Sequence, residues 1–343
     1  MTSSIKLCWV VLLLVLTVFS LTSLAMGPSD LSLNHIMAII ASHAGFQVDT
    51  VWKNWESVVF IDIRIPRVLL AGMVGGSLAL CGAVLQGLFR NPLADPGIMG
   101  VTSGASLGAV LSMFFGLAAV SIWLLPIFAF IGAAATTFVA YTLSARQGQI
   151  SLGLLLLTGL ALGALNTALT SLLISLSVAN FEIASQIVFW LMGGLSGRTW
   201  DQVWIMAPVF LITLPVLFFY SRELDALLVG EVHAAAIGIP VARVRKVLIL
   251  TTALVTGAAV ATAGAIGFIG LVVPHLLRLI AGPHHRNLLP LSILCGAALL
   301  IAADWAARIL APPTEIPLGV VTASLGTPFF IFLLVRRKQE VHL

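Results

Sequence analysis

Long apolar runs joined by short polar connections make up most of this chain. A helix needs roughly 20 mostly apolar residues to cross the hydrocarbon core of a bilayer. The runs are continuous rather than alternating, and this pattern favours helices over a membrane barrel. They predict ten membrane-spanning helices, at residues 7–25, 68–89, 97–118, 121–144, 150–178, 201–220, 247–266, 268–280, 288–310 and 316–335.

Three stretches fit this pattern less simply. The first run resembles a signal peptide, but its length and the poor cleavage site at Met26 favour a retained span. Residues 27–67, which follow it, are mixed and polar. Residues 181–195 predict a short re-entrant or surface helix rather than a further span.

The composition agrees with a membrane protein. Soluble domains carry about 25% charged residues, whereas this chain has 9%, with 60% hydrophobic residues and a mean hydropathy of +1.12. Cys8, Cys81 and Cys295 all fall inside apolar runs, so neither a disulfide nor a metal site is indicated. We therefore expect an all-α polytopic membrane protein with one transmembrane domain over residues 1–343.

The basic residues orient the predicted spans. Ten spans place twelve of the 17 Lys and Arg residues on one side, and five on the other. Because cytoplasmic loops carry the excess of positive charge, both termini are expected in the cytoplasm. This topology explains the sequence pI near 9.3, which therefore does not indicate a nucleic-acid partner. The five residues of the outer side are Lys53, Arg64, Arg67, Arg198 and Arg308.

The segment 222–246 is a polar island on the predicted cytoplasmic side. It contains four basic and three acidic residues between long apolar runs, so it must lie in water. Gly230, Gly238 and Pro240 punctuate it and predict two short helices with a turn between them. A helical projection of this kind is suited to contact a protein outside the membrane.

Catalytic motifs are missing from the sequence. It has no GxxxxGK[ST] phosphate loop, HExxH, GxSxG or CxxC motif, and no series of carboxylates within the spans. His284 and His285 are adjacent in a cytoplasmic loop, where a solvated turn is a better interpretation than a metal site. We expect a protein that is not an enzyme, binds no cofactor and has no energy source of its own.

The span 150–178 is unusually rich in small and hydroxyl residues. Such residues let helices pack closely, but they could also line a water-filled path. Asn166 is hard to place against lipid because its amide needs partners. The residues alone leave both interpretations open.

Three outer arginines also allow two interpretations. Arg64 and Arg67 flank a proline at a helix entry, and Arg308 follows Asp304 by one turn. They could reach toward headgroups, with Asp304 and Arg308 forming an i,i+4 pair. Alternatively, they form a basic rim that docks an acidic partner, although the residues alone favour the first interpretation.

Several motifs together resemble one family, the permeases of type II ATP-binding-cassette (ABC) importers, which move iron-siderophore complexes, haem and cobalamin. The resemblance covers nearly the whole chain from Arg64 onward, and the first 60 residues carry little of it. The matching stretches are RIPRVLLAGMVGGSLALCGAVLQGLFRNPLADPGIMGVTSGASLGA (64–109), FWLMGG (189–194), LLVGEVHAAAIGIPV (227–241), GAIGFIGLVVPHLLRL (264–279) and EIPLGVVTASLGTPFFIFLL (315–334).

The resemblance implies a ten-span permease fold and a set of partners. A second permease copy, giving a homodimer, or a close homologue in its place, would enclose the path. Two cytoplasmic ABC ATPase subunits would hold ATP and Mg, and a periplasmic or lipid-anchored substrate-binding protein would dock outside. The chain would then lie in the inner membrane of a bacterial cell.

The resemblance also implies roles for particular residues, which reverses the preference for the outer arginines. Residues expected to couple to the ATPase are Gly230, Glu231, Ala235, Gly238, Ile239 and Pro240, within the coupling-helix region 222–246. Residues expected to dock the binding protein are Arg64, Arg67 and Arg308. Residues expected along the translocation path are Asn166, Thr167, Thr170, Ser171 and Ser175.

The expected cargo is an iron chelate, either a siderophore complex or haem, with cobalamin as the alternative. No histidine pair is placed to ligate haem inside the path, which favours siderophores. A stand-alone secondary transporter is the alternative of a different class, and it would transport without any ATPase. An intramembrane enzyme is disfavoured because the sequence lacks paired catalytic residues.

Overall fold

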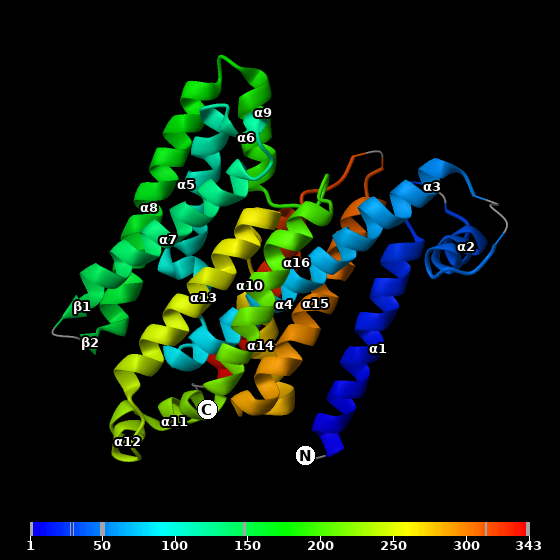
Figure 1. The fold of residues 1–343 in the computed structure, drawn as a ribbon. Coiled ribbons are helices and arrows are strands. Elements are labelled where there is room, and N and C mark those ends of the chain that lie inside the picture. The colour runs from blue at the N-terminus through cyan, green and yellow to red at the C-terminus, as the bar shows by residue number, and fades with distance from the viewer. Residues whose placement is uncertain are drawn as a thin grey trace.

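The computed structural model describes residues 3–27, 29, 31–48, 52–146, 149–312 and 314–340, and this part of the chain is almost entirely helical (Figure 1). The helices are α1 (Ser3–Ala25), α2 (Leu33–His43), α3 (Asn54–Val58), the π-helical η1 (Val59–Arg64), α4 (Ile65–Leu88), the 3-10 helical η2 (Pro96–Met99), α5 (Val101–Phe114), α6 (Leu117–Val120), α7 (Leu124–Ser144), α8 (Leu152–Ser177), α9 (Phe181–Leu191), α10 (Trp200–Phe219), α11 (Ser221–Val229), α12 (Glu231–Ala236), α13 (Val241–Ala263), α14 (Ile269–Ala281), α15 (His285–Ile309) and α16 (Leu318–Glu340). Two short strands, β1 (Ala145–Arg146) and β2 (Gln149–Ile150), pair antiparallel and are a small exception to the expected all-α fold.

Among the described residues, seven helices are long and apolar enough to cross a membrane. They are α1, the continuous run Asn54–Leu88, α7, α8, α10, α13 and α15. The other three expected spans correspond to shorter apolar helices, namely α5, α14 and the part of α16 from Leu318 to Ile331. The chain is thus a polytopic helical membrane protein, and the count of ten spans stays a prediction.

Helix α4 lies at the centre of the bundle and packs against α13, α14 and α15. Small residues let these helices approach closely. A methyl group on Gly82 would overlap the carbonyl oxygen of Gly270, and one on Gly75 would overlap that of Gly296. Close helix packing through small residues is typical of membrane bundles.

Two expected elements differ from the structure. The run 97–118 is not one helix, because Gly100 (φ 78°) and Gly116 (φ 70°) adopt left-handed conformations that separate η2, α5 and α6. The span expected to start at residue 68 instead continues a helix that begins at Asn54 and passes through the π-helical η1. The short helix expected within 181–195 is present as α9.

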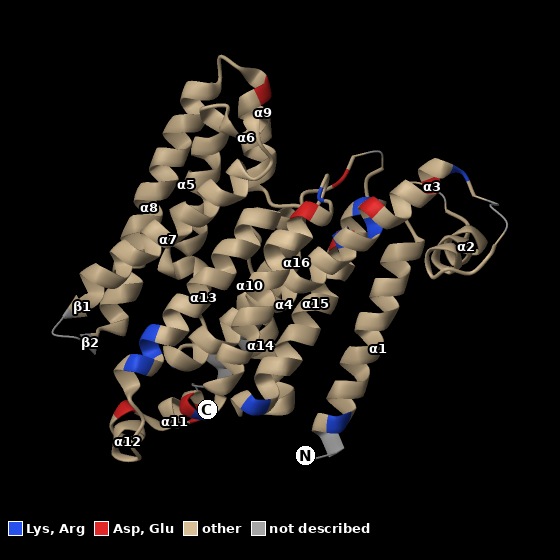
Figure 2. Ribbon diagram, viewed as in Figure 1, with Lys and Arg blue, Asp and Glu red and all other residues tan. Residues whose placement is uncertain are grey.

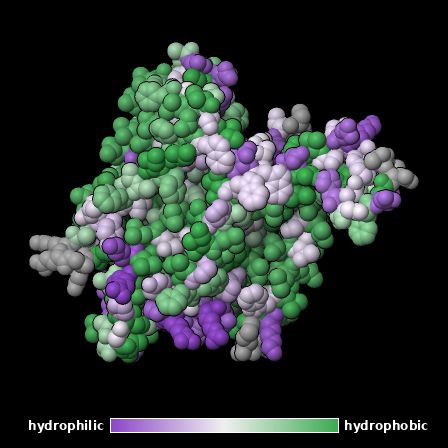
Figure 3. All heavy atoms as spheres, in the orientation of Figure 1, coloured by the Kyte–Doolittle hydropathy of each residue, from purple (hydrophilic) through white to green (hydrophobic). Residues whose placement is uncertain are grey.

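Charge is concentrated at the two ends of the molecule. Lys, Arg, Asp and Glu gather near α11–α12 at one end and near α3, α4 and the α15–α16 connection at the other (Figure 2). An apolar surface separates the two ends (Figure 3). Both chain ends lie at the end with α11 and α12 (Figure 1), so the expected cytoplasmic placement of both termini is consistent with this arrangement.

Candidate functional site

The segment predicted to couple to an ATPase forms two short helices, α11 and α12, that project from the bundle (Figure 1). Gly230 separates them with φ 150°, and Gly238 ends the turn after α12 with φ 88°. No atom lies within 4 Å of a Cβ built on either glycine. A side chain at Gly238 is therefore opposed by backbone conformation and not by crowding.

Part of the surface of this coupling region is apolar. Val232 is 87% exposed, and Val229 and Ile237 are also exposed. Charged residues lie next to these apolar side chains in the sequence: Glu231 forms an ion pair with Arg245 of α13. Large exposed apolar side chains on a polar segment are typical of a protein contact surface.

Arg90 belongs to the same surface, although no sequence pattern predicted its inclusion. It lies with Val229, Val232 and His233 around a groove of about 770 Å³. Its backbone has φ 49°, which is uncommon for a residue other than glycine. The connection after α4 thus lies next to the coupling region, at the same end of the protein.

Asp225 connects the coupling region to α15. Its Oδ1 atom accepts hydrogen bonds from the backbone N–H of His285 (2.8 Å) and lies 2.7 Å from Nδ1 of the same residue. Burial acts to raise the pKa of Asp225, but the hydrogen bonds from His285 outweigh it, and the pKa lies below its usual value. His285 is fully buried, so interpreting it as part of a solvated turn was wrong, whereas His284 is exposed.

The three arginines expected to dock a binding protein are buried at the opposite end. Arg64 donates to the carbonyl oxygens of Leu24 and Ala25 at the end of α1. Their guanidinium groups are thus used inside this chain, and the basic rim does not lie open at the surface. Whether these residues dock a partner stays a prediction.

Arg67 and Arg308 share one carboxylate. Arg67 lies 2.8 Å from both Asp304 and Glu315, and Arg308 lies 3.2 Å from Asp304. The predicted i,i+4 pair between Asp304 and Arg308 is therefore confirmed. Together these four side chains connect α4, α15 and the α15–α16 connection through buried charge.

The residues expected along the path fall on two faces of α8. Asn166 is buried and donates to Thr136 (3.0 Å) and Ser103 (3.3 Å), which supports the helix-packing interpretation for its amide. Thr170 is buried on the same face. The residues on the exposed face are Thr167, Ser171 and Ser175.

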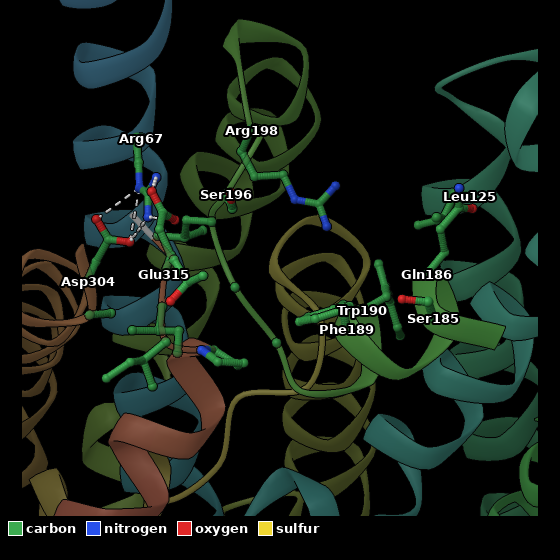
Figure 4. A pocket seen from close by; sticks show the side chains of 18 of the residues that line it. Arg67, Leu125, Ser185, Gln186, Phe189, Trp190, Ser196, Arg198, Asp304 and Glu315 are labelled. Carbon is green, nitrogen blue, oxygen red and sulfur yellow. Dashed lines mark hydrogen bonds and ion pairs between the residues drawn. The ribbon is translucent and has the colours of Figure 1, made fainter. Parts of the chain in front are cut away.

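A cavity of about 760 Å³ lies at the end opposite α11 and α12, between α9 and the connection that precedes α16 (Figure 4). Arg67, Asp304 and Glu315 form one side of it, with their ion pairs. On the other side, the Arg198 guanidinium extends into the open space near Phe189 (Figure 4). Arg198 carried no role in the sequence interpretation beyond its outer position.

The structure thus combines an apolar multi-helix body, an exposed contact region at one end and a polar cavity at the other. These features fit a polytopic transport permease. A model of the FecCD transport family matches residues 12–336. The chain therefore belongs to the FecCD transport family, and it is a permease of the ABC importer class.

Individual relatives and a solved structure support this family assignment. The cobalamin import system permease protein BtuC of Halobacterium salinarum is 46% identical over 83% of this chain and 74% of the relative. The hemin transport system permease protein HmuU of Yersinia pestis is 39% identical over 96% of this chain and 95% of the relative. A solved metal-chelate type ABC transporter in an inward-facing conformation superposes with a TM-score of 0.84 at 35% identity, covering 96% of this chain and 99% of that chain.

Proposed function

We propose that this chain is the membrane subunit of an ATP-driven importer and moves a bulky metal chelate into the cell. The observation that carries this proposal is the exposed apolar surface of the coupling region, formed by Val229, Val232 and Ile237. A membrane protein gains nothing by presenting such a surface to water unless another protein covers it. The partner that fits is a cytoplasmic ABC ATPase, two copies of which would hold ATP and Mg.

The coupling region acts as a lever in this proposal. Closure of the ATPases moves α11 and α12, and the Asp225–His285 contact passes the movement to α15. The Glu231–Arg245 ion pair passes it to α13. Gly238, Ile239 and Pro240 form the joint between α12 and α13, while Ala235 and Gly230 belong to the surface that the ATPase covers.

The path lies between two copies of the chain. The exposed face of α8, with Thr167, Ser171 and Ser175, would face its counterpart in the second copy and line the passage. Asn166 and Thr170 hold α8 against its own bundle from the other face. A passage lined by hydroxyls and apolar groups suits a cargo that must not bind tightly.

When the binding protein docks, Arg67 would exchange one of its carboxylate partners for an acidic residue of the binding protein. Glu315 is the more exposed of its two carboxylates, with a side chain 27% exposed, so an acidic residue from the binding protein could replace it. Arg64 and Arg308 would then hold the outer ends of α1 and α15 in place. Docking of this kind should weaken as salt increases.

The cargo that we favour is a metallated tetrapyrrole, cobalamin or haem. The two relatives named above import cobalamin and hemin, which moves our preference away from siderophores. A siderophore complex remains the alternative within the same class of cargo. The sequence identity of the cobalamin permease is the higher of the two.

Uptake in reconstituted vesicles tests this function. With ATPase, binding protein and ATP present, we expect uptake of at least one chelate from a panel of cobalamin, haem and ferric siderophores. Uptake by this chain without any ATPase would instead identify a stand-alone secondary transporter. No uptake of any chelate with all partners present would contradict the proposal.

The coupling role is tested by Gly238→Val. A β-branched residue at φ 88° costs about 1–3 kcal/mol locally, so the joint after α12 should shift and ATP-driven uptake should be lost while the protein still inserts. Gly45→Val is the matched control, because Gly45 has φ 89° and equally open surroundings but lies far from α12 in sequence, after α2. Normal uptake by Gly238→Val, or equal loss in the control, would argue against a specific coupling role.

A further inference from the structure

The cavity at the end opposite α11 and α12, called the outer cavity below, is large and is lined by aromatic, polar and charged residues. Its volume of about 760 Å³ is typical of a small-molecule site. Phe189 and Trp190 of α9 give it an aromatic wall, and Ser185 and Gln186 of the same helix add polar groups. It opens at the end of the protein opposite the coupling region (Figures 1 and 4).

The charges on one side of the cavity are already matched. Arg67 is paired with Asp304 and Glu315, and each of these carboxylates lies 2.8 Å from the guanidinium. Glu315 is also held by a hydrogen bond with Ser196. This side of the cavity has no charge left over for a ligand.

Arg198, on the other side, is not matched. It forms no ion pair with any residue that the structure describes, and its Nε atom is buried without a hydrogen-bond partner there. Burial lowers the pKa of its guanidinium, because the charged form loses hydration. A partly buried cation without a counterion is costly unless something supplies negative charge.

A second donor in the same wall also lacks an acceptor. Trp190 is only 8% exposed, and its Nε1–H group has no hydrogen-bond partner within the described ranges of the chain. The indole N–H group and the N–H groups of a guanidinium donate hydrogen bonds and cannot accept them. The cavity therefore brings together two unsatisfied donors, one of them cationic, next to the exposed ring of Phe189.

We propose that this cavity is a cargo subsite for an oxyanion, in which Arg198 pairs with a carboxylate or phosphate diester of the chelate while Trp190 donates a further hydrogen bond. The aromatic wall would lie against the flat ring of a tetrapyrrole. Haem carries two propionate carboxylates, and cobalamin carries one phosphate diester, so both cargoes present the required group. This inference rests on the proposed import function and adds the chemistry by which cargo is received.

A recessed location favours cargo over an acidic side chain of the binding protein. Arg198 and Trp190 lie in the wall of the cavity, so a group carried into the cavity can approach both residues, whereas a flat protein surface laid over the outer end cannot. The neighbouring Trp190 and Phe189 offer ring contacts that a carboxylate side chain would not use. Docking to an acidic residue is nevertheless one of the outcomes that the experiment distinguishes.

Matched ligand pairs test the subsite. The permease would be reconstituted with its ATPase in lipid nanodiscs and titrated with haem and its bis-propionamide, and with cobalamin and cobinamide, which lacks the phosphate together with the rest of the nucleotide. In at least one pair, we expect the oxyanion-bearing member to bind roughly tenfold or more tightly than the member without the oxyanion, as for a charge-assisted hydrogen bond. Arg198→Gln should abolish that preference, and Arg198→Lys should retain part of it.

Two further variants make the test specific. Trp190→Phe removes the N–H group and keeps a smaller aromatic ring, so it should reduce the preference by less than Arg198→Gln does. Lys53→Gln removes an exposed cation of the predicted outer side that does not line the cavity, and it should leave the preference unchanged.

Three results would overturn the subsite. They are binding of neither pair by the wild-type complex, equal weakening of both members of a pair by Arg198→Gln, and weaker docking of a cargo-free binding protein in that variant. The last result would assign Arg198 to the binding protein. ATP-dependent uptake in vesicles judges the importer function separately, so failure of the subsite leaves that function standing.

Discussion

At the scale of single residues, Asp225 is the anchor of the coupling region. It is the only acidic residue of α11 for which the structure describes a hydrogen bond to α15, through His285. His285 packs so closely on α4 that a methyl group on Gly87 would overlap its ring. Asp225 thus holds a surface helix to a tightly packed part of the bundle.

The lowered pKa of Asp225 predicts a pH-dependent stability. Because the folded pKa lies below the unfolded value of about 3.9, the ionised carboxylate stabilises the folded protein above that value, and the contribution is lost as the pH falls through the folded pKa. Asp225→Asn should therefore lower the free energy of unfolding by about 1–3 kcal/mol at neutral pH. The difference from wild type should narrow as the pH falls below about 4, the unfolded value, toward the lower folded pKa.

Thermal unfolding of the purified protein between neutral and acidic pH measures this effect. Glu223→Gln is the control, because Oε2 of Glu223 has no hydrogen-bond partner in the part of the chain that is described. A difference between wild type and Asp225→Asn that stayed constant across the whole pH range would show that the carboxylate charge is not responsible.

At the scale of elements, the helix Asn54–Leu88 determines how the bundle packs. Its 35 residues span about 52 Å at the usual rise of an α-helix. The hydrocarbon core is only about 30 Å thick, so this helix extends beyond it and carries Arg64 and Arg67 near its outer end. Inside the bundle, its glycines let α14 and α15 approach.

Gly82→Ala tests that close approach. The added methyl group would overlap the backbone of Gly270, so α4 and α14 must separate, and overpacking of this kind costs about 1–3 kcal/mol or more. Gly163→Ala in α8 is the control, since its methyl group would meet only Ser103 Oγ at an ordinary 3.6 Å. We expect a large loss of folded protein for the first variant and little change for the second, measured by size-exclusion profiles in detergent. Equal yields would mean that the helices repack freely.

The existence of most helices could be predicted from the sequence because continuous apolar runs have a length set by the bilayer. The breaks could not, since Gly100 and Gly116 look like the many helical glycines of this chain until their backbone conformation is known. The early start of the helix at Asn54 was missed because its outer part is polar.

The site was predictable in part. Gly230, Gly238 and Pro240 marked the short helices of the coupling region, because glycine and proline act locally on the backbone. The partners of Arg67 and His285 depend on contacts more than 50 residues away in sequence, which hydropathy does not reveal. Arg198 was missed for the same reason, since its lack of a partner is a property of the folded cavity.

At the scale of the whole molecule, α8 presents an extensive uncovered face. Its exposed residues include Leu157, Leu160, Leu165 and Leu172 beside the hydroxyls of Thr167 and Ser171. The leucines suit lipid or a second copy of the chain, and the hydroxyls suit water. If the proposed path is correct, only the part of this face that carries the hydroxyl groups is in contact with water.

Cysteine labelling can map that wet part. With Cys8, Cys81 and Cys295 replaced by alanine, Thr167→Cys, Ser171→Cys and Ser175→Cys should react with a water-soluble maleimide in the assembled transporter. Thr170→Cys, on the buried face, should react much more slowly. Labelling of the buried position alone, or of none of the three exposed positions, would contradict a path along this face.

Both chain ends lie at the same end of the molecule as α11 and α12 (Figure 1). A hydrophilic linker can therefore join the end of one copy to the start of the next without crossing the lipid. In such a tandem polypeptide, Gly238→Val can be placed in one half only, so every molecule carries one intact and one altered coupling region. The rate of ATP-driven uptake by that fusion would reveal whether one intact coupling region suffices or whether both are required.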